Sequence, residues 1–148
     1  MVVVNLWGYR SGRSEIRDAM IANTAVSGGI KAGDILIEDQ STTQYFTQGA
    51  AGSNEPRCVA LVNLPTIPTN DGDVSIPAEF SEDALYEYPA DTGTVTAALI
   101  GKTMDMGGPQ SMNIDAGIDN IFTVHEVNLD HNSVIGKFNF SAGRTVAS

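Results

Sequence analysis

This sequence has little cysteine, few basic residues and no long apolar run. Its one cysteine, Cys58, excludes a framework of internal disulfides. Lysine and arginine number 8 against 18 aspartates and glutamates, and the net charge of -10 disfavours a protein that mainly neutralises nucleic-acid phosphates. No stretch approaches the roughly 20 apolar residues of a membrane-spanning helix. We therefore expect no nucleic-acid partner and no membrane partner.

The length and composition are those of one folded domain. The 148 residues suffice for a single core, 42% of them are hydrophobic, and the 15 glycines are spread along the chain. The opening residues 1–7 are apolar but few, and they have no basic start, so they do not resemble a secretory signal. We expect the protein to act in a cytoplasm or in a particle assembled there.

Charge divides the chain into a slightly basic arm and an acidic body. Residues 1–31 hold four basic and two acidic side chains, whereas residues 58–136 hold one basic and twelve acidic ones. We predict an arm over residues 1–27, a β-rich body over residues 28–140 and a tail over residues 141–148. Within the arm, residues 14–22 place apolar side chains at helical spacing behind a capping serine, which predicts about two turns of helix.

Short runs rich in β-branched and aromatic residues alternate with turn signals through the body. These runs cover residues 30–38, 57–62, 74–76, 84–88, 94–100, 121–127 and 134–140. The polar stretch 41–56 predicts a surface loop or a ragged hairpin. The last two runs predict a closing hairpin with four inward side chains, Phe122, Val124, Phe138 and Phe140. The expected fold is mainly β, a small β-barrel or β-sandwich with an extended N-terminal arm.

None of the motifs that carry catalysis, a cofactor or a metal ion is complete. Residues 101–103 (GKT) are similar to the end of a phosphate-binding loop, but Thr96 stands where the first glycine is required. His125 and His131 have no third ligand at a diagnostic spacing, so we assign them structural roles. Cys58 lies in an apolar run, where burial leaves an inert thiol. We predict no catalytic, cofactor-binding or metal-binding residue.

Three passages together resemble the head decoration, or cement, proteins of tailed bacteriophages. The first is the strand at residues 32–37 (AGDILI), and the second is residues 58–61 (CVAL). The third begins at residues 71–76 (DGDVSI) and continues to the closing strands near Phe122 and Phe138. The long insertion at residues 41–56 and the basic arm depart from the family pattern.

The resemblance implies a structural protein without enzymatic activity. Such proteins are small β-rich modules that bind the outer surface of the expanded capsid, often as trimers, and lock neighbouring shell subunits together. It implies the major capsid protein as partner, a homotrimer as the oligomeric state and the virion surface as the location. The residues alone leave two other classes open, a small-ligand or glycan-binding β-domain and a small β-rich hydrolase.

The arm carries the predicted interface. Trp7 and Tyr9 lie beside Arg10, Arg13 and Arg17, and aromatic residues with arginine are enriched at protein interfaces. We predict that the arm reaches away from the body. Trp7 is then buried against a neighbouring copy or the shell, and at least one of these arginines pairs with a carboxylate there.

Overall fold

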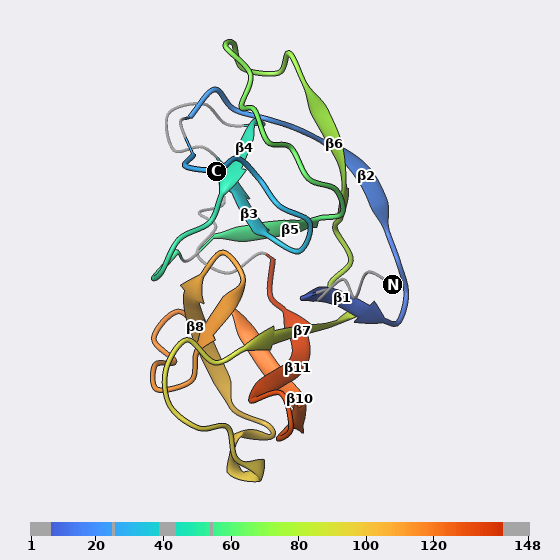
Figure 1. Ribbon diagram of the computed structural model, residues 1–148. Helices are drawn as coiled ribbons and strands as arrows, with labels where there is room; N and C mark the ends of the chain where they lie inside the picture. The colour runs from blue at the N-terminus through green and yellow to red at the C-terminus, as the bar shows by residue number, and fades with distance from the viewer. Residues whose placement is uncertain (1–6, 25, 39–43, 54, 141–148) are drawn as a thin grey trace, which may run out of the picture.

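The structure, a computed structural model, describes residues 7–24, 26–38, 44–53 and 55–140 (Figure 1). These residues form two antiparallel sheets and one short 3-10 helix, η1 (Ala97–Leu99), so the prediction of a mainly β fold is confirmed. No helix in these ranges is long and apolar enough to cross a bilayer. The strands are β1 (Gly8–Ser11), β2 (Ile16–Met20), β3 (Ile35–Glu38), β4 (Phe46–Gln48), β5 (Pro56–Ala60), β6 (Ser75–Glu79), β7 (Leu85–Pro89), β8 (Thr103–Gly108), β9 (Ser111–Asn113), β10 (Phe122–Asn128) and β11 (Ser133–Phe138).

Each sheet curls back on itself, so that β2 approaches β4 in one sheet and β7 approaches β9 in the other. The five-stranded sheet has the order β2-β6-β5-β3-β4, and a parallel bridge between Ile21 and Phe46 joins its two ends. The other sheet has the order β1-β7-β11-β10-β8-β9, and a parallel bridge between Ala90 and Met112 joins β9 to the end of β7. We call β2–β6 the N-terminal barrel and β7–β11 the C-terminal barrel. Strand β1 is an addition at the outer side of β7.

The two barrels share one topology. Replacing β2, β3, β4, β5 and β6 by β7, β8, β9, β10 and β11 converts the first strand order into the second. The pairing register agrees as well, since Leu36 lies opposite Cys58 where Met104 lies opposite Phe122. The structure is therefore an internal duplication, which was not predicted from the sequence.

Backbone hydrogen bonds outside the strand ladders are duplicated too. The bond from Gly33 N to Ala60 O (2.8 Å) in the N-terminal barrel matches the bond from Gly101 N to Val124 O (2.8 Å) in the C-terminal barrel. In the same way, Ala22 N to Phe46 O (2.9 Å) matches Asp91 N to Met112 O (2.9 Å). The third match is between Ile21 N to Val74 O (3.0 Å) and Ala90 N to Asn132 O (3.1 Å). The equivalence therefore extends from strand order to individual atoms.

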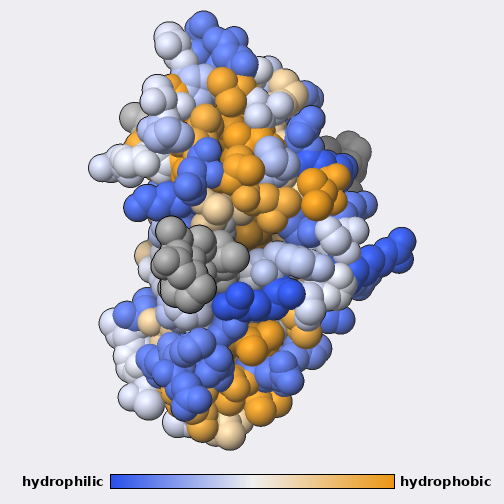
Figure 2. Space-filling view, turned by 45° about the vertical axis from the view of Figure 1, so that its right-hand side comes forward, coloured by the Kyte–Doolittle hydropathy of each residue, from blue (hydrophilic) through white to orange (hydrophobic). Residues whose placement is uncertain are grey.

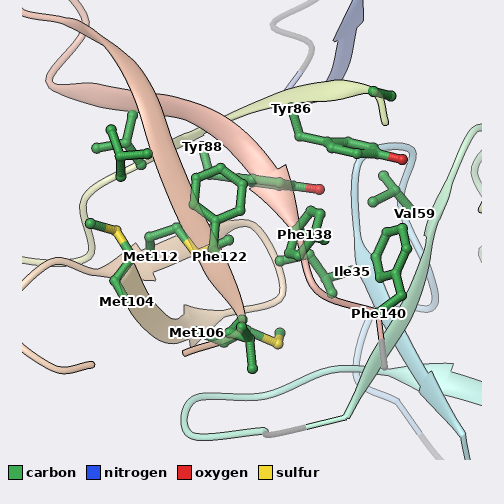
Figure 3. Close-up of a cluster of buried hydrophobic side chains, with 14 of the residues drawn as sticks. Ile35, Val59, Tyr86, Tyr88, Met104, Met106, Met112, Phe122, Phe138 and Phe140 are labelled. Carbon is green, nitrogen blue, oxygen red and sulfur yellow. The ribbon is translucent and has the colours of Figure 1, made fainter. Parts of the chain in front are cut away.

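The C-terminal barrel is filled by aromatic and methionine side chains (Figure 3). Tyr86 and Phe138 meet edge to face with ring centres 5.0 Å apart, and Phe122 packs on Phe138 at the same distance. The four residues predicted to point inward from the closing hairpin are all buried, so that prediction is confirmed. The turn of this hairpin uses Asn132 at a φ of 52°, a left-handed conformation that asparagine tolerates.

The N-terminal barrel has a smaller core with a different filling. Four of its buried residues are small, namely Ala19, Cys58, Ala60 and Ala78. The larger side chains come from strands, as with Leu36 and Ile76, and also from the long connections. In these connections Ile30 and Leu64 form an antiparallel bridge, and Ile67 and Val74 pack against the cluster.

Two local predictions are wrong. Residues 14–22 form strand β2 and its continuation instead of a helix, because Ile16–Met20 pair with β6 over five residues. Residues 94–100 are not a strand, since η1 and a turn occupy them before β8 begins. In the first case, long-range pairing with β6 overrides a two-turn helical pattern that is too short to persist alone.

The predicted arm is built into the body over its described part. Strand β1 pairs with β7 and strand β2 pairs with β6, so residues 8–20 form edge strands of both sheets (Figure 1). The prediction that this segment reaches away from the body is wrong for these residues, because backbone pairing and the packing of Tyr9 on Tyr86 hold it in place. Residues 1–6, residue 25 and the predicted tail 141–148 lie outside the described residues.

Candidate interaction surface

The five predicted interface residues lie along one side of the molecule, on a segment that changes sheets. Trp7 precedes β1, Tyr9 and Arg10 lie in it, Arg13 lies in the link, and Arg17 lies in β2. Figure 2 views the side of the molecule on which β1 and β2 lie, and it shows apolar side chains gathered in the upper half, with a further group near the bottom. Two apolar side chains of β2 are well exposed, Ile16 at 59% and Met20 at 42%.

Trp7 and Tyr9 line an apolar hollow of about 220 Å³. The other lining residues are Ala32, Gly33, Ala60 and Leu61. Gly33 adopts a φ of 95°, and a Cβ atom there would stand 2.4 Å from the carbonyl oxygen of Trp7. The hollow therefore depends on a glycine at this position.

Tyr9 is anchored on the chain's own core. Its ring meets Tyr86 edge to face with centres 6.2 Å apart, and its hydroxyl donates to the carbonyl of Gly12 at 2.8 Å. Trp7 is half-buried against the C-terminal core. Both residues border the hollow.

Arg10 pairs within the chain. Its Nε donates to the buried carboxylate of Glu87 at 2.6 Å, and the Ser133 hydroxyl donates to the other oxygen. Burial raises the pKa of Glu87, but the hydrogen bonds from Ser133 and Arg10 and the charge of Arg10 outweigh it and hold that pKa below its ordinary value. Because the chain's own Glu87 pairs with Arg10, the predicted ion pair with a neighbour's carboxylate is left to Arg13 or Arg17.

The other two arginines are more open. Arg13 lines a shallow polar hollow of about 190 Å³ with Ser14 and residues 81–83. The guanidinium of Arg17 lies over the ring of Phe80, 4.3 Å from its centre, a cation–π contact. The structure thus brings Trp7 and Tyr9 together and separates them from Arg17, which faces the opposite side of β2 from Ile16.

The remaining sequence candidates are placed as follows. Lys102 leads into strand β8, whereas a phosphate-binding loop leads into a helix. His131 is exposed and lies 3.9 Å from Glu87, and His125 is exposed on β10. Among the described residues no three His, Cys, Asp or Glu side chains are grouped as a metal site requires. Cys58 is fully buried, which raises the pKa of its thiol, as expected of an inert side chain.

Besides Glu87, three more buried carboxylates were not identified from the sequence. Asp34 accepts from the side-chain amides of Gln48 (2.7 Å) and Gln110 (2.8 Å), which joins the two barrels. Asp105 accepts from backbone amides of residues 118–120, and Glu79 accepts from the Ser14 hydroxyl. Each has hydrogen-bond donors at hand, so these carboxylates fix loops and strand ends. No sequence signal distinguished them from the other acids.

No protein-family model matches the chain, and the comparison with curated proteins finds no significant match.

Proposed function

We propose that this protein is a structural component that binds neighbouring protein subunits of an assembly, as the decoration proteins of tailed-phage heads do. The observation that supports this best is the open apolar hollow bordered by Trp7 and Tyr9. Tryptophan and tyrosine contribute strongly to protein interfaces when a partner covers them, because they offer large rigid surfaces. A partner side chain of moderate size fits about 220 Å³.

The edge position of β1 adds to this proposal. Among the described strands, β1 is the outer member of its sheet, and an unpaired sheet edge accepts a further strand from a partner. In the proposed assembly the partner is the major capsid protein, the chain is a homotrimer on the outer virion surface, and no catalytic turnover is involved.

The test is binding of the purified chain to particles that carry it. Particles are first analysed by mass spectrometry for this chain and then stripped of it, and the purified chain is added back and followed by co-sedimentation. We expect Trp7→Ala to bind about tenfold more weakly or worse, since loss of a central aromatic anchor costs about 2 kcal/mol. Asp18→Ala, an exposed change on the same segment, is the control.

The outcomes are decisive in both directions. Saturable rebinding that Trp7→Ala weakens and Asp18→Ala leaves intact supports the proposal. Absence of the chain from purified particles would overturn it. Equal binding of both variants would move the contact away from the hollow and remove its main support.

A further inference from the structure

A pocket of about 350 Å³ opens at one end of the N-terminal barrel. Strands β2, β4 and β5 begin at this end, and β3 and β6 end there, so their terminal side chains converge on one point. The side chains that matter here are Arg17, Glu38, Phe46, Arg57 and Phe80, with Phe140 reaching over from the other barrel. We call this pocket the barrel mouth.

The equivalent end of the C-terminal barrel is closed by apolar side chains. Arg17 lies opposite Ala78 on the neighbouring strand, as Tyr86 lies opposite Gly136, and Tyr86 is fully buried. The two side chains even pack on equivalent rings, Arg17 on Phe80 and Tyr86 on Phe138. The N-terminal barrel therefore has an arginine where the C-terminal barrel has a core aromatic side chain.

Two more positions have a charged side chain in the N-terminal barrel and an apolar side chain in the C-terminal barrel. Glu38 is opposite Phe46 where Met106 is opposite Met112, and Met106 is 1% exposed. Cys58 and Phe122 are equivalent, because they pair with the equivalent residues Leu36 and Met104. The residues just before them, Arg57 and Ile121, are therefore equivalent too. Three positions that close one barrel thus carry charge in the other, and the pocket lies among those charges.

The barrel mouth is held in shape before any ligand arrives. Arg57 is only 7% exposed, and its Nε donates to Glu38 at 3.3 Å. Its terminal nitrogen donates to the carbonyls of Pro56 and Phe140, which ties the mouth to both barrels. A charged side chain fixed in this way lowers the cost of ordering on binding.

The chemistry of the lining points to a neutral ligand with many hydroxyl groups. Two guanidinium groups face three carboxylates, those of Glu38, Glu15 and Glu82, so the charges nearly balance and neither a strong anion nor a strong cation is favoured. Guanidinium donates and carboxylate accepts, and a sugar hydroxyl does both. Phe46 and Phe80 supply apolar surface for the carbon side of a sugar ring, and the volume falls within the range of small-ligand pockets.

We propose that the barrel mouth binds a neutral monosaccharide or disaccharide unit through Arg17, Arg57 and Glu38. This site does not depend on the assembly role proposed above, since its residues are distinct from the hollow at Trp7. The two barrels differ at this end, because charged side chains line the mouth of one and buried apolar side chains occupy the matching positions of the other.

The experiment is a titration of the full isotope-labelled chain followed by amide and arginine Nε–H NMR signals. The probes are glucose, galactose, mannose, N-acetylglucosamine and lactose at millimolar concentrations. We expect saturable shifts at Arg17, Arg57 and Phe80 with at least one of them. Arg17→Tyr, which installs the closing residue of the other barrel, should weaken that binding about tenfold or more, whereas Arg13→Tyr should not.

A second variant guards against misfolding of the first. Glu38→Gln keeps the side-chain volume, removes one acceptor charge and should also weaken binding about tenfold. The proposal is overturned when none of the five sugars gives saturable shifts at the mouth, when folded Glu38→Gln binds like the wild type, or when sodium acetate or ammonium chloride gives the same shifts at lower concentration than any sugar.

Discussion

The two barrels have the same strand pairing but different interiors. Where the C-terminal barrel has Tyr88 and Phe122, the N-terminal barrel has Ala19 and Cys58, and all four side chains are buried. Part of the N-terminal core comes from connections between strands, Ile30 among them, whereas the aromatic and methionine side chains of the C-terminal core lie mostly on its strands. Backbone pairing therefore sets the topology, and side-chain volume decides where the barrel is closed.

The strongest way to test this difference is to truncate equivalent core residues. Phe122→Ala should lower the free energy of unfolding by about 3–5 kcal/mol, because a buried ring with two aromatic neighbours leaves a large cavity. Cys58→Ala, at the matching position, should cost about 1 kcal/mol, since it removes one atom. Denaturant unfolding followed by Trp7 fluorescence measures both. Equal losses of unfolding free energy in the two variants would mean that both cores are equally tightly packed and would contradict the proposed difference between the barrels.

Two glycines at equivalent positions of the barrels allow the cost of backbone strain to be measured apart from the cost of a steric clash. Gly33 and Gly101 have φ values of 95° and 86°, but a Cβ atom at Gly101 meets nothing within 4 Å. Gly101→Ala should therefore cost about 1–2 kcal/mol from strain alone. Gly33→Ala should cost roughly 3 kcal/mol, because a clash with the Trp7 carbonyl is added.

The same unfolding measurement applies to this pair, and the emission maximum of Trp7 gives a second readout. It should shift in Gly33→Ala, where the clash displaces the segment, and stay unchanged in Gly101→Ala. Similar costs and unchanged emission in both variants would show that Trp7 does not pack on Gly33 in solution.

The smallest expected effect concerns charge at equivalent positions of β7 and β2. Glu87 is buried and hydrogen-bonded, while its counterpart Asp18 is exposed. Glu87→Gln should lower the free energy of unfolding by about 2 kcal/mol at neutral pH, as expected for hydrogen bonds to a charged group, and Asp18→Asn by less than about 0.5 kcal/mol.

The stabilisation by Glu87 should depend on pH, and the direction follows from its pKa. The folded pKa of Glu87 lies below the ordinary value of 4.5, so the unfolded chain binds the proton more readily. The stabilisation is complete above pH 4.5 and is lost as the pH falls through the lowered folded value. The difference between the wild type and Glu87→Gln should therefore shrink on acidification. A difference that stays constant from neutral pH to well below that value would contradict the assignment.

Much of the β architecture was predictable because its signals are local. The alternation in the closing hairpin identified Phe122, Val124, Phe138 and Phe140 as core residues, and the apolar run around Cys58 identified a buried thiol. Residues 14–22 show where local signals fail, since β2 pairs with β6 some 60 residues later and that pairing outweighs a two-turn helical pattern.

The candidate site residues also fall into those predicted from the sequence and those found only in the structure. The sequence by itself determined that Trp7 and Tyr9 are candidate contact residues, because an aromatic pair beside arginines is visible without any fold. Only the tertiary structure decided that Arg10 satisfies Glu87 within the chain, and that Arg17, Glu38 and Arg57 meet at one barrel end. Those three lie about 20 residues apart along the chain, and closure of the sheet alone brings them together. The physical reason is that strand pairing acts between distant segments, whereas sequence patterns report on neighbours.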